Sequence, residues 1–294
     1  MPKGFPTSFQ PAIALARAFV KQHAMTTLPW HTKLVLALLA FLPAFFLVSA
    51  LGTKIGLWGW QIGLLALTMG GGVILLGITA LAALVSLIIA LRAKPRRNPV
   101  LAAAIVGLLV PGAIFVMFMA AGVKAGENPI HDISTDTGNP PAFSDETLAA
   151  REAAGANPLA DYQTPLGEIE IYQQGIAPEL AVKSHAQIIT ARKDRPAPLP
   201  LGGASKAQGV AAVAAAMSKM GLKDIRTDAE GGRVEGVDET FWFGFRDDVV
   251  ARVGDQQIDF RSVSRVGQSD LGANTARIEE LRKETEALLG SASR

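Results

Sequence analysis

Three long runs without a charged residue fill most of the first half of the chain and constrain its fold more than any other feature. They occupy residues 34–53, 55–91 and 98–123. A helix needs about 20 mostly apolar residues to cross a hydrocarbon core about 30 Å thick, and each run meets that length. The sequence therefore predicts a membrane protein with three transmembrane helices, at about 34–53, 61–91 and 99–123.

The middle run is long enough for two interpretations. Trp58 and Trp60 stand where an aromatic belt at the membrane interface is expected, which places the start of a single helix near Gln61. A break at glycines 70–72 would instead make two short spans. The single helix is favoured, because two spans would export the basic segment "RAKPRR", residues 92–97, against the usual cytoplasmic excess of Lys and Arg.

Charge divides the chain into two parts. Ten of the 28 basic residues and none of the 26 acidic residues precede Glu127, so residues 1–124 carry +10 and the rest carries 18 − 26 = −8. With three spans, the N-terminal segment 1–33 and the loop 92–97 share the positive, cytoplasmic side. We therefore expect a multi-pass protein of the bacterial inner membrane, with the lipid bilayer as a partner and residues 128–290 in the periplasm.

The predicted spans have the character of an anchor. No Asp, Glu, Lys, Arg or His lies inside them. Ionisable side chains within a span are the usual mark of an ion or proton pathway, so their absence from these segments disfavours a pump or transporter. Ahead of the first span, residues 11–24 form a candidate interfacial helix with Arg17 and Lys21 one turn apart.

Residues 128–290 are expected to form a water-soluble α+β domain. An S-x-x-Q capping box at 205–208 begins a helix. Alternating segments follow as strands, among them "TFWFGF" at 240–245, and "GEIEIYQ" at 167–173 is an earlier strand candidate. A last helix begins near 270–274. This order predicts an antiparallel sheet with two helices packed on one face.

One polar run near the end of this domain is the candidate site. It reads "RSVSRVGQSDLGANTARI", residues 261–278. Alternation along a strand puts Arg261 and Arg265 on one face and Ser262 and Ser264 on the other. Guanidinium groups beside the N–H groups of a helix start suit a carboxylate or phosphate, so a small anionic ligand is a candidate partner. The candidate ligand-binding residues are Arg261, Ser262, Ser264, Arg265, Ser269, Asp270, Asn274, Arg277, His131, Asp132 and Asp136.

The alternative interpretation of the same run is structural. The arginines at 261 and 265 would then pair with carboxylates and tie the segment that leads into the domain to the sheet. The candidate carboxylates are Asp132, Asp136, Asp259 and Asp270. Arginines that line an open pocket would favour a ligand site, and arginines that each hold a buried carboxylate would favour a structural role.

Three motifs in this half resemble a known family. They are "HDISTDTGNPPAF" at 131–143, "FGFRDDVVARV" at 243–253 and "IDFRSVSRVGQSDLGANTARI" at 258–278. In this order they resemble the bacterial and plastid family filed as domain of unknown function 1499, in its form with three preceding membrane helices. The resemblance covers roughly 128–290 and implies no activity and no catalytic residue. The family's signature maps onto His131, Asp132, Ser134, Thr135, Asp136, Asn139, Pro140, Pro141, Asp247, Asp248, Arg261, Ser262, Ser264, Arg265, Gly267, Ser269, Asp270, Gly272, Asn274, Arg277 and Ile278.

Few residues point to catalysis or to a cofactor. The chain has no cysteine and no G-x-S-x-G motif, and His131 and His185 are the histidines that follow the spans. "DISTDTG", residues 132–138, imitates a calcium loop, but Gly138 comes one place late and position twelve is Phe143. A charge of −8 disfavours nucleic acid. We therefore expect no metal, no cofactor and no nucleic-acid partner.

Three functions remain open at this point. The first, which we favour, is a non-catalytic binding or assembly module that engages an envelope or membrane protein or a small anion. The second is an envelope hydrolase built on the Asp/His/Arg cluster. The third is a purely structural accessory subunit of a membrane complex.

Overall fold

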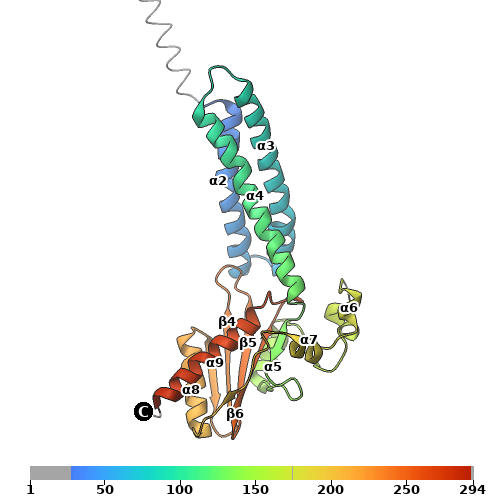
Figure 1. Cartoon of the computed structure of the whole chain (residues 1–294), viewed down its shortest axis with the longest axis vertical. Coiled ribbons are helices and arrows are strands. Elements are labelled where there is room, and N and C mark those ends of the chain that lie inside the picture. The colour runs from blue at the N-terminus through green and yellow to red at the C-terminus, as the bar shows by residue number, and fades with distance from the viewer. Residues whose placement is uncertain (1–27, 174, 293–294) are drawn as a thin grey trace, which may run out of the picture. The chain divides into compact units, whose positions relative to one another are not determined.

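The computed structural model describes residues 28–173 and 175–292 and divides the chain into two compact units (Figure 1). We refer to the unit that ends at Phe118 as the helical unit and to the unit that begins at Met119 as the sheet domain. The candidate interfacial helix at 11–24 and most of the N-terminal segment 1–33 lie outside the described residues.

The helical unit is made of long apolar helices. They are α2 (Trp30–Lys54), the π-helix η2 (Gln61–Gly71) continued by α3 (Gly72–Arg92), and α4 (Asn98–Glu127), which runs on into the sheet domain. Among the described residues, the three helices of 25, 32 and 30 residues are long and apolar enough to cross a membrane. The middle helix is continuous through the glycines at 70–72, where π-helical geometry changes to α-helical geometry.

Small residues let these helices approach closely. A Cβ atom at Gly107 of α4 would lie 2.5 Å from Val35 Cγ1 of α2 and 2.7 Å from Ala83 Cβ of α3. Hydroxyl groups supply polar contacts between helices, as in the 2.7 Å hydrogen bond that joins Ser49 Oγ and Thr68 Oγ1. Both features are typical of helices packed in a membrane, where small residues allow contact and hydroxyls bond across helices.

The sheet domain is built on a six-stranded antiparallel sheet of order β1-β6-β5-β4-β3, with β2 also paired to β6. The predicted α+β class with an antiparallel sheet is confirmed. The strands are β1 (Asp132–Ser134), β2 (Leu199–Pro200), β3 (Lys223–Asp228), β4 (Arg233–Glu239), β5 (Arg246–Val253) and β6 (Gln257–Ser264).

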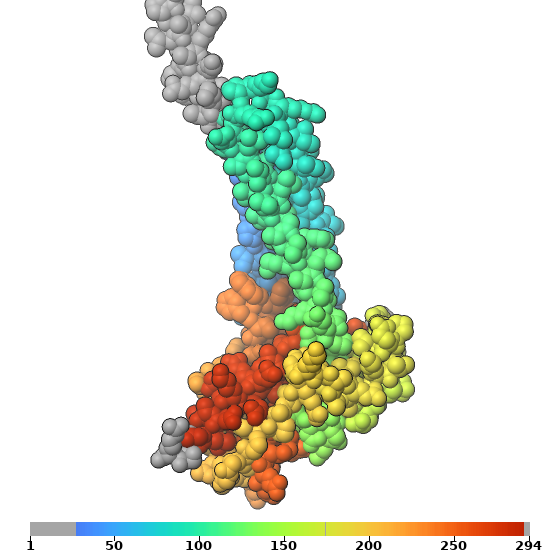
Figure 2. Space-filling model, viewed as in Figure 1, coloured from blue at the N-terminus to red at the C-terminus, as the bar shows by residue number. Residues whose placement is uncertain are grey.

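Two long helices cover one face of this sheet, as predicted. Helix α8 (Lys206–Lys219) begins at the capping box of Ser205 and Gln208 and contacts β3, β4 and β5, while α9 (Ala273–Ala292) contacts β6 and β1 (Figure 1). In the space-filling view the red atoms of α9 form part of the visible surface of the sheet domain (Figure 2). The shorter helices are α5 (Asp145–Ala153), η3 (Leu166–Glu168), η4 (Glu170–Tyr172), α6 (Pro178–Ala181) and α7 (His185–Ala191).

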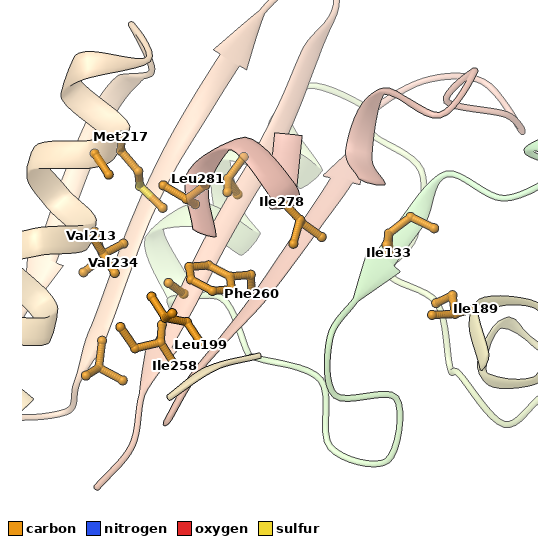
Figure 3. Close-up of a cluster of buried hydrophobic side chains, with 14 of the residues drawn as sticks. Ile133, Ile189, Leu199, Val213, Met217, Val234, Ile258, Phe260, Ile278 and Leu281 are labelled. Atoms are coloured by element: carbon orange, nitrogen blue, oxygen red, sulfur yellow. The ribbon is translucent and has the colours of Figure 1, made fainter. Parts of the chain in front are cut away.

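Side-chain alternation along the central strands divides the interior in two. Ile258 and Phe260 of β6 point toward α8 and α9 and meet side chains such as Met217 and Ile278 (Figure 3). Val263, also on β6, belongs to a smaller cluster on the opposite face with Phe143 and Val250. The main core therefore lies between the sheet and its two long helices.

Two of the strand predictions were wrong. The segment 167–173 contributes to the consecutive 3₁₀ turns of η3 and η4, and it belongs to none of the strands found among the described residues. The segment 240–245 is the turn between β4 and β5, which are already joined at the pair Glu239 and Arg246. Gly244 has a φ of +68°, which favours glycine and turns the chain at this point.

Strand β3 forms one edge of the sheet and is irregular. Its register with β4 shifts between Lys223 and Arg226, and Asp224 has a φ of +51°. Four of its six residues are charged, and four of its six positions are exposed to solvent. A bulge and charged side chains are the usual means of blocking the free hydrogen-bonding groups of an edge strand.

Candidate functional site

The sheet separates the predicted polar run into two groups. Arg261 and Arg265 point to the face that carries α5, whereas Ser262 and Ser264 bond to Asn274 on α9. This division follows from the alternation of side chains along β6. The run therefore contributes to two buried networks, one on each face, and not to a single cluster.

On the α5 face, Arg261 holds Asp132. Its Nε lies 3.0 Å from Asp132 Oδ1 and its Nη2 lies 2.6 Å from Oδ2, which is bidentate geometry. The Tyr162 hydroxyl also donates to Oδ1 at 2.5 Å, and the backbone N–H of Ala160 donates to Oδ2 at 3.2 Å. Burial alone raises the pKa of Asp132, but the guanidinium and these donors outweigh it and bring the pKa below its ordinary value. Asp132 is therefore an ionised, fully bonded carboxylate.

On the same face, one carboxylate holds two arginines. Arg265 donates to Asp248 from Nε at 2.9 Å and from Nη2 at 2.7 Å, and Arg151 of α5 donates from Nη1 at 2.5 Å. All three side chains are buried. Arg151 also donates to the carbonyl of Asn157 at 2.8 Å, which fixes the chain after α5. Asp248 therefore ties α5 and the end of β6 to β5.

The network on the helix face is centred on Arg277 of α9. Its Nη2 lies 2.6 Å from Asp238 Oδ2 and 2.8 Å from Asp247 Oδ2, and its Nη1 donates to Asn274 Oδ1 at 2.6 Å and to Ser262 Oγ at 2.9 Å. Asp238 and Asp247 lie on β4 and β5, so these contacts hold α9 against three neighbouring strands.

The start of α9 is capped by side chains of its own segment. Asp270 accepts hydrogen bonds from the N–H groups of Gly272 at 2.8 Å and Asn274 at 3.0 Å, and Ser269 accepts one from Leu271 at 3.1 Å. Burial raises the pKa of Asp270. These donors, which an anion would need, are already occupied.

Two histidines and a tyrosine form the least satisfied part of the interior. His131 Nδ1 lies 2.7 Å from the Tyr172 hydroxyl, which lies 3.4 Å from His185 Nε2. Within the part of the chain that the structure describes, His131 Nε2 and His185 Nδ1 have no hydrogen-bond partner. Burial lowers the pKa of His131, and it lowers the pKa of His185 to about 4. Both rings are therefore neutral at pH 7.

Asp136 lies apart from both networks, on a half-buried turn. Its Oδ1 accepts from the N–H groups of Gly138 and Asn139, both at 3.0 Å, and its Oδ2 accepts from Arg252 at 2.9 Å. These local bonds give "DISTDTG" its turn. Among residues 28–173 and 175–292, no group of three His, Asp or Glu side chains is placed to hold a metal ion.

Two cavities of the sheet domain lie apart from these arginines. One of about 490 Å³ is lined by Leu201 and Leu289, and another of about 470 Å³ by Arg192 and Thr275. Neither is lined by an arginine of the predicted run. The arginines of that run are suited to holding strands and helices together, and neither of these two cavities reaches them.

Sequence reasoning missed several residues of these networks. Arg151, Tyr162, Tyr172 and Asp238 were outside the predicted set, and each contributes from an element far along the chain from its partner. For Asp238 there was a usable signal, because an acidic residue in an otherwise buried strand requires a counter-charge. The two tyrosines lie in irregular segments that carry no periodic signal.

Comparison with known proteins gives one match. A family model described as a protein of unknown function, DUF1499, matches residues 132–285. This region contains the six strands of the sheet and most of α9. No curated protein and no solved structure matches the chain.

Proposed function

Since the chain belongs to the DUF1499 family of proteins of unknown function, we propose its role from architecture: a membrane-anchored, non-catalytic binding or assembly module of the bacterial envelope. The three apolar helices supply the anchor. The excess of basic residues before Glu127 supports a cytoplasmic N-terminus and a periplasmic sheet domain.

The occupied arginines are the observation that carries this proposal. Arg261, Arg265 and Arg277 are 5%, 8% and 8% exposed, and each guanidinium bonds to at least one carboxylate. Removing one partner of a buried ion pair costs about 3–5 kcal/mol, because it leaves the other charge uncompensated. The arginines of the polar run therefore stabilise the fold of the domain, and we place the binding of a partner on its outer surface.

The same observation also fits a structural accessory subunit of a membrane complex. The two roles differ in the stability of the association. An accessory subunit remains with its complex through purification in detergent, whereas a binding module exchanges its partner. Crosslinking in native membranes, followed by purification with and without the crosslinker, separates them: we expect an envelope or membrane protein that is recovered only after crosslinking.

A hydrolase is the second candidate, and the unpartnered ring nitrogens of His131 and His185 favour it. Both rings are buried, at 1% and 0% exposure, so substrate would need an opening that reaches them. The variant His131→Gln tests this reading. Recovery of the crosslinked partner unchanged in His131→Gln supports the module. Release of products from isolated envelope material by the parent chain, lost in His131→Gln, supports the hydrolase.

Thiol labelling tests the orientation, because the chain contains no cysteine and any introduced cysteine is unique. Lys193→Cys places an exposed thiol on the sheet domain, and Lys94→Cys places one in the loop between the second and third helices. In intact spheroplasts, a membrane-impermeant maleimide should label Lys193→Cys and leave Lys94→Cys unlabelled until the membrane is opened. The reverse pattern overturns the periplasmic assignment.

A further inference from the structure

The turn between β4 and β5 carries four aromatic residues in six positions. We call residues 240–245 the aromatic tip. Thr240 closes it, because its N–H donates to the Phe245 carbonyl at 2.9 Å and its Oγ1 accepts from the Phe245 N–H at 2.9 Å. The rings of Phe243 and Phe245 stack with centroids 5.2 Å apart. The tip is therefore a defined structure with a bonded base.

The outer end of the tip is exposed to solvent. Phe241 is 70% exposed and Trp242 is 54% exposed, and their rings meet edge to face at 4.9 Å. Burial of a large apolar side chain is favourable, and these two rings largely forgo that gain in the domain by itself. A paired, exposed aromatic surface of this kind marks a contact site.

Strand register places the tip at the end of the sheet where the chain arrives from α4. Glu239 pairs with Arg246 at the base of the tip, Asp247 pairs with Ser264, and Val263 pairs with Asp132 at the start of β1. From β1 to β4 there are three strand spacings, or about 14 Å. The end of α4 at Glu127 precedes Asp132 by five residues, which span at most about 17 Å.

Charge around the tip differs from charge over the rest of the domain. Lys223 and Arg246 are exposed and lie 3.2 Å and 3.6 Å from Glu239. With Asp224, this rim is neutral, whereas the chain beyond Lys124 carries −8. An anionic surface therefore repels this rim less than it repels the domain as a whole, and the exposed Lys223 and Arg246 can meet lipid headgroups.

We propose that the aromatic tip lies in the headgroup interface of the bilayer that holds α2, α3 and α4, as a second point of attachment for the sheet domain. Trp and Phe with cationic neighbours have the chemistry of this interface, in which aromatic rings sit at the level of the headgroups. Asp132 of β1 follows the end of α4 by only five residues, so the linker that leads from the last apolar helix into the sheet is short. The proposal rests on the anchoring half of the proposed function and not on which compartment the domain faces.

A fluorophore on the tip tests the proposal in the full chain. Trp242→Cys provides a unique thiol for an NBD label, and the protein is reconstituted in nanodiscs of phosphatidylethanolamine and phosphatidylglycerol with a nitroxide on a fraction of the headgroups. The matched control is Gln256→Cys, an exposed site in the turn between β5 and β6, about 25 Å away at the other end of the sheet.

We expect strong nitroxide quenching and a blue-shifted NBD emission at position 242, and neither effect at position 256. Adding Phe241→Ser to the labelled chain should reduce the quenching several-fold, because it removes apolar area from the tip. Absence of quenching at 242, as expected if the tip is covered by a protein partner or a second copy, overturns the proposal. Equal quenching at 242 and 256 also overturns it. Because nanodiscs expose both leaflets, a reversed orientation in the thiol-labelling experiment leaves this result intact.

Discussion

The helical unit and the sheet domain bury polar groups by opposite means. In the helical unit, the buried polar contacts involve hydroxyl groups, such as Ser49 Oγ with Thr68 Oγ1 at 2.7 Å and the Ser86 hydroxyl with His31 Nδ1 at 2.7 Å. In the sheet domain, ionised carboxylates and guanidinium groups meet in the interior, as in the pair of Asp132 and Arg261. Within residues 28–118 no Asp, Glu, Lys or Arg is buried, whereas buried ion pairs hold the sheet domain together.

This difference teaches where each unit is vulnerable. The cost of desolvating two buried charges offsets most of the attraction between them, so an intact pair contributes little net stability. Removing one partner is strongly destabilising, because the other charge stays buried without compensation. The packing of uncharged helices through small residues depends instead on how closely their surfaces fit together. We therefore expect the sheet domain to be sensitive to charge and pH, and the helical unit to be sensitive to side-chain volume.

The largest effect is expected from Arg261→Ala. It leaves Asp132 buried without its counter-charge, and the free energy of unfolding of the sheet domain should fall by about 3–5 kcal/mol. Pulse proteolysis of the full chain in urea, read from fragments of the sheet domain, measures the change.

Arg246→Ala is the control, because Arg246 is exposed and lies 3.6 Å from Glu239. It should change the free energy of unfolding by at most about 1 kcal/mol. If the two arginine variants are equally stable, the buried pair does not support the fold as described.

The next effect is a pH dependence that His185 introduces. Its pKa is about 4 in the fold and 6.5 ordinarily. Between these values the unfolded chain takes up a proton that the folded chain does not, so stability is complete above pH 6.5 and is lost as the pH falls toward 4. The loss from one such group approaches about 1.4 kcal/mol per pH unit. His185→Gln should lower this slope in unfolding curves recorded from pH 7.5 to 4.5, and an unchanged slope would remove His185 as its source.

The smallest effect tests the helical unit. Gly107→Leu forces a side chain into the contact with Val35 and Ala83 and should cost about 1–3 kcal/mol by overpacking. Gly112→Leu on the same helix is matched in composition and meets no atom within 4 Å of its Cβ position. Thermal loss of helical circular dichroism in detergent compares them. Equal midpoints for the two variants would mean that α4 does not pack against α2 and α3 through Gly107.

The predictable part of the structure is the part set by local periodicity. Uncharged runs located the helices, and alternation along β6 correctly assigned Arg261 and Ser262 to opposite faces. Among the carboxylates considered, Asp132 is indeed the partner of Arg261, while Arg265 pairs with Asp248, which had not been considered as a partner. Arg261 and Asp132 are 129 residues apart, so their pairing depends on strand order, which no local pattern reports.

The aromatic tip shows why alternation alone is insufficient. Phe241, Phe243 and Phe245 alternate as strand residues do, but Gly244 and the hydrogen bonds of Thr240 turn the chain there. The histidine–tyrosine contacts were also beyond prediction, because Tyr172 lies in a 3₁₀ turn and reaches His131 from 41 residues away.

The irregular, charged rim formed by β3 has a consequence for many copies of this chain held in one plane. Confinement to a bilayer raises the encounter rate between neighbouring copies and aligns them. These conditions favour hydrogen bonding between exposed edge strands of different molecules. The bulged and charged edge strand β3 presents no straight row of backbone donors and acceptors for this intermolecular pairing. Many copies of the chain can therefore lie close together in a membrane without pairing through their β3 strands.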